Sequence, residues 1–352
     1  MLLQIRPAIE CGRKYAFPAV WLAVFATGVG WRLPGPAVEA SSFLSFNTGS
    51  AQAATPTQSV FFALAAQPAS LTFVRHDVEP EEAIQTGARE ASGGHGRFAA
   101  PGNAVRRQVQ LRAINPRTAD ELVGFFQQVS YTLNDIRQGE AVPAIKLERV
   151  PEDLVTKEGP LRKTLFITAL LPVILEVNQR VLAEREQLIF LRGKMGTLAG
   201  LTPTERMWLE QLANRYDTPS DKLDELLRRV DIVPPSMAIA QGGVESGWGT
   251  SPAARSNALF GMVSGGGKPL PFGNVGEAAN AYVANLNTHA AYAAFRAERA
   301  ALRDRGEALD GYRLIGTLLR YSELGSQYVG FIRQVMKDDK LTDFDKAKLS
   351  SY

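Results

Sequence analysis

The sequence predicts a mainly α-helical protein, and three observations support this fold class. Apolar residues recur at the three- and four-residue spacing of a helix face in several segments between residues 118 and 230. Two of these segments begin with residues that commonly start helices. No stretch shows the sustained alternation of apolar and polar residues that marks paired strands, and we find no internal repeat.

The first predicted helix begins after Thr118. Thr118 and Glu121 have the spacing of a capping box, in which each side chain accepts a hydrogen bond from the backbone amide of the other residue. Behind this box, apolar residues recur at helical spacing, and we expect them to form one buried stripe. The stripe consists of Leu122, Phe125, Phe126, Val129 and Leu133.

Residues 165–175 form a largely apolar run that continues into an amphipathic segment. A run of about 11 residues is too short to cross a bilayer, so we expect a core helix with a kink near Pro172. Thr202, Pro203 and Glu205 open another helix in the same way as Thr118. Apolar positions mark one more helix at Leu223, Leu226, Leu227 and Val230.

The first 40 residues resemble an export segment. Arg6, Arg13 and Lys14 precede an apolar run at residues 15–31, and a small-x-small cleavage pattern follows at residues 38–40. The run of roughly 17 residues is at the lower limit for a transmembrane helix. We therefore expect residues 1–40 to be a signal peptide or a membrane anchor, and the protein to be periplasmic or anchored in the inner membrane facing the periplasm.

Residues 41–104 are rich in Ala, Ser, Gly, Thr, Gln and Pro. Such a segment cannot bury enough apolar surface to offset the entropy of an ordered chain. We expect it to be a low-complexity tether, followed by a helical extension at residues 105–230.

Composition argues against several functions. The formal net charge is +3, and we find no dense Lys/Arg face of the kind that binds nucleic acid. The single cysteine, Cys11, lies in the predicted export segment, and the three histidines lack the spacing of metal ligands. We expect no structural zinc and no cofactor.

A short helix near residues 235–246 carries the strongest chemical signal. Pro234 and Pro235 suit a helix start and Gly247 suits a helix end, so Glu245 is expected in the last turn of a largely apolar helix. The negative end of the helix dipole and partial burial both raise the pKa of a carboxyl group there, as a general acid requires. The alternative is a solvated glutamate, or one that pairs with Arg255.

Gly242 and Gly243 lie inside the same predicted helix, where each costs about 1 kcal/mol relative to alanine. They permit close packing or the close approach of a ligand, or have no particular role.

The motifs around Glu245 resemble a known family. The pattern A-Q-x-x-x-E-S-G-W-G-x-S at residues 240–251 and N-x-L-F-G at residues 257–261 resemble the glucosaminidase domain of glycoside hydrolase family 73. Asn285 to His289 with Tyr292, and Tyr321-Ser322 with Tyr328, extend the resemblance to Bax-type bacterial proteins. It covers roughly residues 231–341, which we expect to be the glucosaminidase domain, followed by a tail at residues 342–352.

The resemblance implies a lysozyme-like, mainly helical fold and cleavage of the β-1,4 bond after N-acetylglucosamine in peptidoglycan. It makes Glu245 the general acid and Tyr321 the tyrosine near the acid, in a position to orient water or the acetamido group of the sugar. For Tyr321 and Tyr328, core packing is the alternative. The expected substrate-binding residues are Gln241, Ser246, Trp248, Phe260, Tyr321 and Tyr328.

The second catalytic group is not evident. Most glycosidases use two carboxylates, and the family's second acid usually follows the L-F-G motif, but residues 262–276 contain none. Glu277 is the first candidate, although with Asn274 it forms another capping box. Glu323, assistance by the acetamido group, and loss of activity are the other hypotheses.

Three functions follow from these motifs. The leading hypothesis is a peptidoglycan hydrolase whose partners are glycan strands. A lytic transglycosylase-like enzyme also works with one glutamate and would explain the missing second acid. The non-enzymatic alternative is an inactive module that binds the cell wall.

Overall fold

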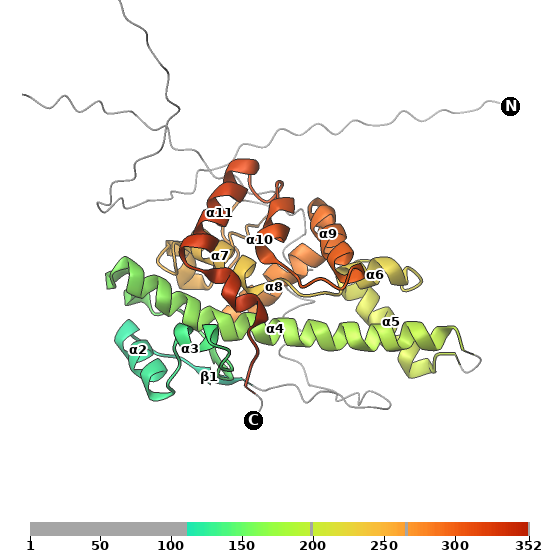
Figure 1. Ribbon diagram of the computed structural model, residues 1–352, viewed down its shortest axis with the longest axis horizontal. Helices are drawn as coiled ribbons and strands as arrows, with labels where there is room; N and C mark the ends of the chain where they lie inside the picture. Colours follow the sequence, from blue (N-terminus) through green and yellow to red (C-terminus); the bar gives the residue numbers. More distant parts are fainter. Residues whose placement is uncertain (1–110, 198–199, 265–266, 351–352) are drawn as a thin grey trace, which may run out of the picture. The chain divides into compact units, whose positions relative to one another are not determined.

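The computed structural model describes residues 111–197, 200–264 and 267–350, and this part of the chain is mainly α-helical, as predicted (Figure 1). The predicted export segment and tether lie outside the described residues. The α-helices are α2 (Ala119–Gln128), α3 (Leu133–Arg137), α4 (Gly159–Met195), α5 (Pro203–Arg215), α6 (Leu223–Arg229), α7 (Pro235–Ser246), α8 (Val275–Thr288), α9 (Ala293–Asp304), α10 (Gly311–Leu314) and α11 (Ser326–Asp338). Short 3₁₀ helices are η1 (Glu152–Thr156), η2 (Pro252–Ser256), η3 (Ala290–Tyr292), η4 (Ile315–Thr317) and η5 (Leu341–Lys346).

The strands of the described region form a small parallel pair. Strands β1 (Arg112–Ile114) and β2 (Ile145–Leu147) pair with Arg112 opposite Ile145. An isolated parallel bridge joins Val142 to Leu349 near the C-terminus, and an antiparallel bridge joins Val263 to Pro269.

The predicted helix starts are present. The hydroxyl of Thr118 accepts a hydrogen bond from the amide of Glu121 at 3.1 Å, but the Glu121 carboxylate accepts from the amide of Arg117, so only half of the predicted capping box forms. Thr202 with Glu205 forms a complete capping box. The stripe predicted from Leu122 to Leu133 is divided between two helices, because Ser130 has φ of 50° and Thr132 caps α3 anew. Helical periodicity continued across this break and therefore concealed it.

Helix α4 is the central element of the core. It has 37 residues and continues through Pro172, and among the described residues it is long and apolar enough by composition to cross a membrane. However, 78% of its apolar window is buried inside the protein, which agrees with the prediction of a core helix. In the view of Figure 1, α4 runs between the group formed by α2, α3 and β1 and the helices α7 to α11.

The N-terminal extension, the C-terminal domain and the end of the chain share one core. Helix α4 packs on α7, α8 and β2, and Asn178 of α4 exchanges hydrogen bonds of 2.7 and 3.2 Å with the backbone of Val233, just before α7. The segment expected to be a tail is also packed: Phe344 of η5 is fully buried, and η5 contacts α7. Helix α7 is therefore held from several sides.

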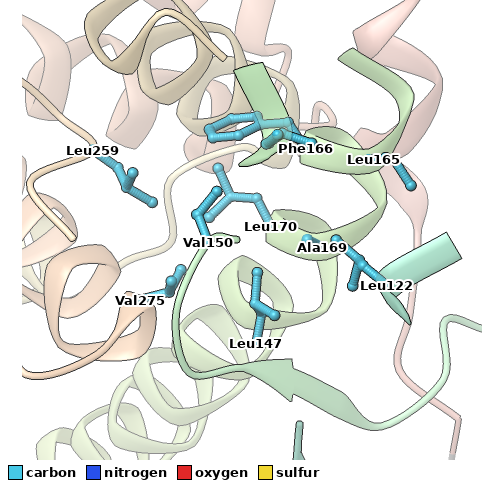
Figure 2. Close-up of a pocket in the computed structure, with 10 residues that line it drawn as sticks. Leu122, Leu147, Val150, Leu165, Phe166, Ala169, Leu170, Leu259 and Val275 are labelled. Atoms are coloured by element: carbon cyan, nitrogen blue, oxygen red, sulfur yellow. The ribbon is translucent and has the colours of Figure 1, made fainter. Parts of the chain in front are cut away.

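An apolar cavity of about 10 Å³ lies beside α4, between it, β2 and the start of α8, and Glu245 is not among the residues that line it (Figure 2). Side chains of α4, β2 and α8 point toward it, and Figure 2 shows only apolar groups. Its lining is Leu122, Leu147, Val150, Leu154, Leu165, Phe166, Ala169, Leu170, Leu259 and Val275. A space of this size holds about one water molecule, and without polar partners it stays dry, so we regard it as a packing defect of the core.

Candidate active site

Helix α7 holds Glu245 in its last turn, as predicted. The helix begins at Pro235 with no capping bond from the side chain of its own N-cap residue, Pro234. Asp345 of η5 replaces that cap: its carboxylate accepts hydrogen bonds of 2.8 Å from both the amide and the hydroxyl of Ser236. The helix ends where Gly247 adopts a left-handed conformation with φ of 60°.

The paired glycines of α7 allow close packing. A Cβ atom on Gly243 would lie 2.7 Å from the Trp248 ring, and one on Gly242 would lie 3.1 Å from Phe260 and 3.2 Å from Leu170. Of the two uses considered for these glycines, close packing is the one that the structure shows.

The residues after Glu245 build the turn that follows α7. The Ser246 hydroxyl donates to the carbonyl of Gly242 at 2.6 Å and accepts from the amide of Gly249 at 2.9 Å. Trp248 has a left-handed φ of 60°, and its ring packs edge-on against Phe166 of α4. The Trp248 ring is partly exposed, whereas Ser246 is buried with both hydrogen bonds satisfied inside the protein. Ser246, expected to bind substrate, thus has a structural role in this conformation.

The carboxyl group of Glu245 is half-buried and has one hydrogen-bond donor among the described residues. The hydroxyl of Tyr328 on α11 donates to Oε1 at 2.8 Å. Burial raises the pKa of Glu245 from 4.5 to about 7, and the bond from Tyr328 opposes that rise. The predicted increase in pKa is therefore present, and it arises chiefly from desolvation.

Pairing with Arg255, the alternative considered for Glu245, is not seen. In the described part of the chain Glu245 makes no ion pair, and Arg255 is exposed, with its carbonyl accepting a bond from Arg149. Burial raises the pKa values of four tyrosines in this region, and the charge of Glu245 raises them further. These tyrosines are Tyr282, Tyr292, Tyr321 and Tyr328. The acid is surrounded by neutral phenols.

The tyrosine that contacts the acid is Tyr328, and Tyr321 lies one ring further away. Tyr321 stacks on Tyr328 with ring centres 5.6 Å apart, and its hydroxyl donates to the carbonyl of Phe260 at 2.8 Å. Phe260 in turn stacks on Tyr282 at 4.4 Å. Tyr321 and Phe260 are both buried, so in this conformation their side chains pack the wall behind the acid rather than facing solvent.

Gln241 links this wall to Glu245. Its Nε2 atom donates to the Tyr328 hydroxyl at 3.0 Å, and its Oε1 atom accepts from the Tyr282 hydroxyl at 2.8 Å. All three side chains are buried. A continuous chain of hydrogen bonds therefore runs from Tyr282 through Gln241 and Tyr328 to Glu245.

Neither second-acid candidate is among the causes of the raised pKa of Glu245. The Glu277 carboxylate accepts from the amide of Gly273 at 2.8 Å and from the side chain of Asn274 at 3.0 Å, which is its predicted role at the start of α8. Glu323 is exposed in the segment before α11. The influences on the pKa of Glu245 are its burial and Tyr328, with no contribution from another carboxylate of the described residues.

Sequence reasoning did not identify two residues of this arrangement. Tyr282 was not among the expected site residues, and Asp345 fell in the expected tail. A tyrosine on a buried helix face and an acidic residue next to an apolar residue are weak signals of a role in the site, because both sequence patterns are common. Within the described residues no group of three or more His, Cys, Asp or Glu side chains is placed to hold a metal ion.

The fold, together with a match to a known family, defines the class of protein: this is a mainly helical, lysozyme-like glycosidase domain with an N-terminal helical extension. The glucosaminidase family, described as mannosyl-glycoprotein endo-beta-N-acetylglucosaminidase, matches residues 220–344. Protein bax of Escherichia coli (strain K12) is 34% identical over 212 residues, which cover 55% of this chain and 76% of that protein. No solved structure gives a significant match. The chain belongs to the Bax-type glucosaminidase family.

Proposed function

We propose that the protein is a peptidoglycan hydrolase that cleaves the β-1,4 bond after N-acetylglucosamine, with Glu245 as general acid. The observation that carries the proposal is the half-buried carboxyl of Glu245, whose pKa is raised to about 7 by burial. A carboxyl group with this pKa is protonated in a large fraction of molecules near neutral pH. It is therefore able to protonate the leaving oxygen of a glycosidic bond.

Helix α7 and Tyr328 supply the two features that such an acid needs. The apolar surroundings of α7 favour the neutral, proton-bearing form. After the proton has left, the hydroxyl of Tyr328 stabilises the new charge on Oε1, from 2.8 Å away. Retaining and inverting glycosidases add a second carboxylate about 5 to 10 Å from the acid. Because no other carboxylate of the described residues contributes to the raised pKa of Glu245, we propose that the acetamido group of the substrate, or a water molecule, attacks the anomeric carbon.

We further propose that the domain acts outside the inner membrane. The support is the sequence alone: the apolar run at residues 15–31 after basic residues, and the tether at residues 41–104. In this proposal the tether gives the glucosaminidase domain reach into the cell wall, whether the export segment is cleaved or remains as an anchor.

Digestion of purified peptidoglycan by the wild-type protein and by Glu245→Gln tests the function. We expect the wild type to release fragments that end in a reducing N-acetylglucosamine, identified by mass spectrometry, and Glu245→Gln to release almost none. The control is Glu307→Gln, which makes the same chemical change at an exposed residue paired with Arg305. Fragments with anhydro-sugar ends would show that the enzyme is a lytic transglycosylase instead of a hydrolase. Binding to peptidoglycan without any cleavage would favour a wall-binding module.

A further inference from the structure

The geometry points to Tyr282, Gln241 and Tyr328 as positioning residues that fix the transferable proton of Glu245 on Oε2, the carboxyl oxygen that Tyr328 does not contact. This inference rests on the proposed role of Glu245 as an acid. It adds a specific task for three buried side chains that come from different helices, α8, α7 and α11.

The first step concerns Oε1. This oxygen accepts the hydroxyl proton of Tyr328, so a proton on Oε1 would have to displace that bond. Tyr328 would then accept hydrogen bonds from both Glu245 and the Nε2 atom of Gln241, and its own O–H would lose its acceptor. Tyr328 is only 2% exposed, so water cannot easily replace that acceptor. Protonation on Oε1 is disfavoured for this reason.

The second step concerns the direction in which the hydrogen bonds run from Tyr282 through Gln241 to Tyr328. Gln241 is able in principle to flip its amide, after which Tyr328 would donate to its Oε1 atom instead of to Glu245. The flip would turn the Nε2 donor toward the hydroxyl of Tyr282, which now donates to Gln241 at 2.8 Å. Tyr282 is fully buried, and the flip would take from its hydroxyl the acceptor that it has in this structure. Tyr282 therefore holds Gln241 in the orientation in which the hydroxyl of Tyr328 donates its hydrogen bond to Glu245.

The third step concerns Oε2. No donor among the described residues contacts this oxygen, and the Glu245 side chain keeps partial exposure. During the reaction the Oε2–H bond breaks and the proton joins the glycosidic oxygen. The bond from that oxygen to the anomeric carbon breaks as the acetamido oxygen of the substrate, or a water oxygen, forms a bond to that carbon. The charge left on the carboxylate is then shared with Oε1, which already has its donor. The series of hydrogen bonds thus leaves Oε2 to give the proton and lets Oε1 carry part of the negative charge that remains on the carboxylate.

Among the side chains that face Glu245, this series of hydrogen bonds supplies the one donor to its carboxyl group in the described residues. From the elements packed around it, the phenols of Tyr282, Tyr292, Tyr321 and Tyr328 sense its charge. Asp345 of η5 contacts the opposite end of α7, at Ser236. Of the four phenols, Tyr328 bonds directly to Glu245 and Tyr282 bonds to Gln241.

Substitutions of the three hydrogen-bonded residues, made in the full-length protein, give a graded test. Tyr328→Phe removes the donor to Oε1, Gln241→Met removes the link at nearly constant volume, and Tyr282→Phe removes only the terminal hydroxyl while keeping the ring stacked on Phe260. Tyr216→Phe is the matched control, because its hydroxyl also donates to a carboxylate, Glu184 at 2.8 Å, but on α4.

The readout that needs no substrate is infrared difference spectroscopy with isotope-edited glutamate, which reports both the pKa of Glu245 and the stretching frequency of its C=O group. We expect Tyr328→Phe to raise the pKa of Glu245 by about 1 unit and Tyr282→Phe by about 0.5, with Gln241→Met between them. The C=O frequency should rise in the same order, because a hydrogen bond to Oε1 lowers it. Tyr216→Phe should match the wild type in both.

Kinetics on glycan fragments supplies the second readout. We expect Tyr282→Phe to lower kcat about 3- to 10-fold and to leave KM nearly unchanged, because the proton is misplaced while binding is intact. A Tyr282→Phe protein with the wild-type pKa and C=O frequency at Glu245 would overturn the proposal, whatever its activity. If the spectra shift as expected but the wild-type protein cleaves no glycan, the positioning chain stands and the proposed enzymatic function fails.

Discussion

Replacement of Glu245 by Gln should stabilise the protein at alkaline pH. The substitution keeps the size of the side chain and its hydrogen bond from Tyr328, but removes the ionisable proton. Folding raises the pKa of Glu245 from 4.5 to about 7, so the native state binds that proton more tightly than the unfolded state does. The contribution of this group to stability is therefore complete below pH 4.5 and is lost as the pH rises through 7.

The size of the effect follows from the shift. One pKa unit corresponds to about 1.4 kcal/mol, so a rise from 4.5 to about 7 corresponds to roughly 3 to 4 kcal/mol at most. Because Glu245 retains partial exposure, we expect about 1 to 3 kcal/mol at pH 8 and a difference near zero at pH 4.5. The same variant should lose at least about 100-fold in turnover, the smaller value typical of general acid catalysis.

Urea unfolding of the wild type and of Glu245→Gln at pH 4.5, 6 and 8 measures the difference directly. Other groups titrate in both proteins, including Asp345, whose pKa is raised by burial to about 6, and their contributions cancel in the comparison. A constant difference between the two proteins from pH 4.5 to 8 would refute the reasoning, because it would show that folding leaves the pKa of Glu245 unchanged.

Three other substitutions test the frame that holds the acid. Asp345→Ala should cost about 1 to 2 kcal/mol in urea unfolding at pH 7, because Ser236 loses its cap; wild-type stability would contradict that role. Glu277→Gln should cost on the order of 1 kcal/mol and keep most glycan cleavage, so a folded but inactive variant would show that Glu277 is catalytic. Gly243→Ala should lower stability by about 1 to 3 kcal/mol despite the better helix propensity of alanine, because its Cβ would meet the Trp248 ring; a more stable variant would refute the packing argument.

Local signals predicted the features that depend on a few neighbouring residues. The caps at Thr118, Thr202 and Asn274 are present because each involves contacts within four residues. The position of Glu245 at the end of its helix followed from Pro235 and Gly247 in the same way. The raised pKa was expected because a largely apolar helix is buried in a folded protein, although the elements that pack on α7 supply that burial.

Features that depend on distant packing were not predictable. Tyr321 and Tyr328 occur in one short segment and are both buried, and only the packing of α11 on α7 decides which hydroxyl meets Glu245. The cap from Asp345 to Ser236 joins residues 109 positions apart. The break at Ser130 was hidden for a different reason: a single left-handed residue interrupts the backbone but leaves the apolar period unchanged.

The pKa of Glu245 is a balance between two opposing effects, which explains how one carboxyl group can serve without a partner. In a two-carboxylate site, charge repulsion between the pair helps to hold the proton on the acid. Here burial alone raises the pKa of Glu245, and the bond from Tyr328 limits the rise. Burial makes the proton available near neutral pH, and the bond stabilises the carboxylate that remains. A bound glycan would cover the exposed part of Glu245 and strengthen the first effect without weakening the second, since Tyr328 reaches the acid from inside the core.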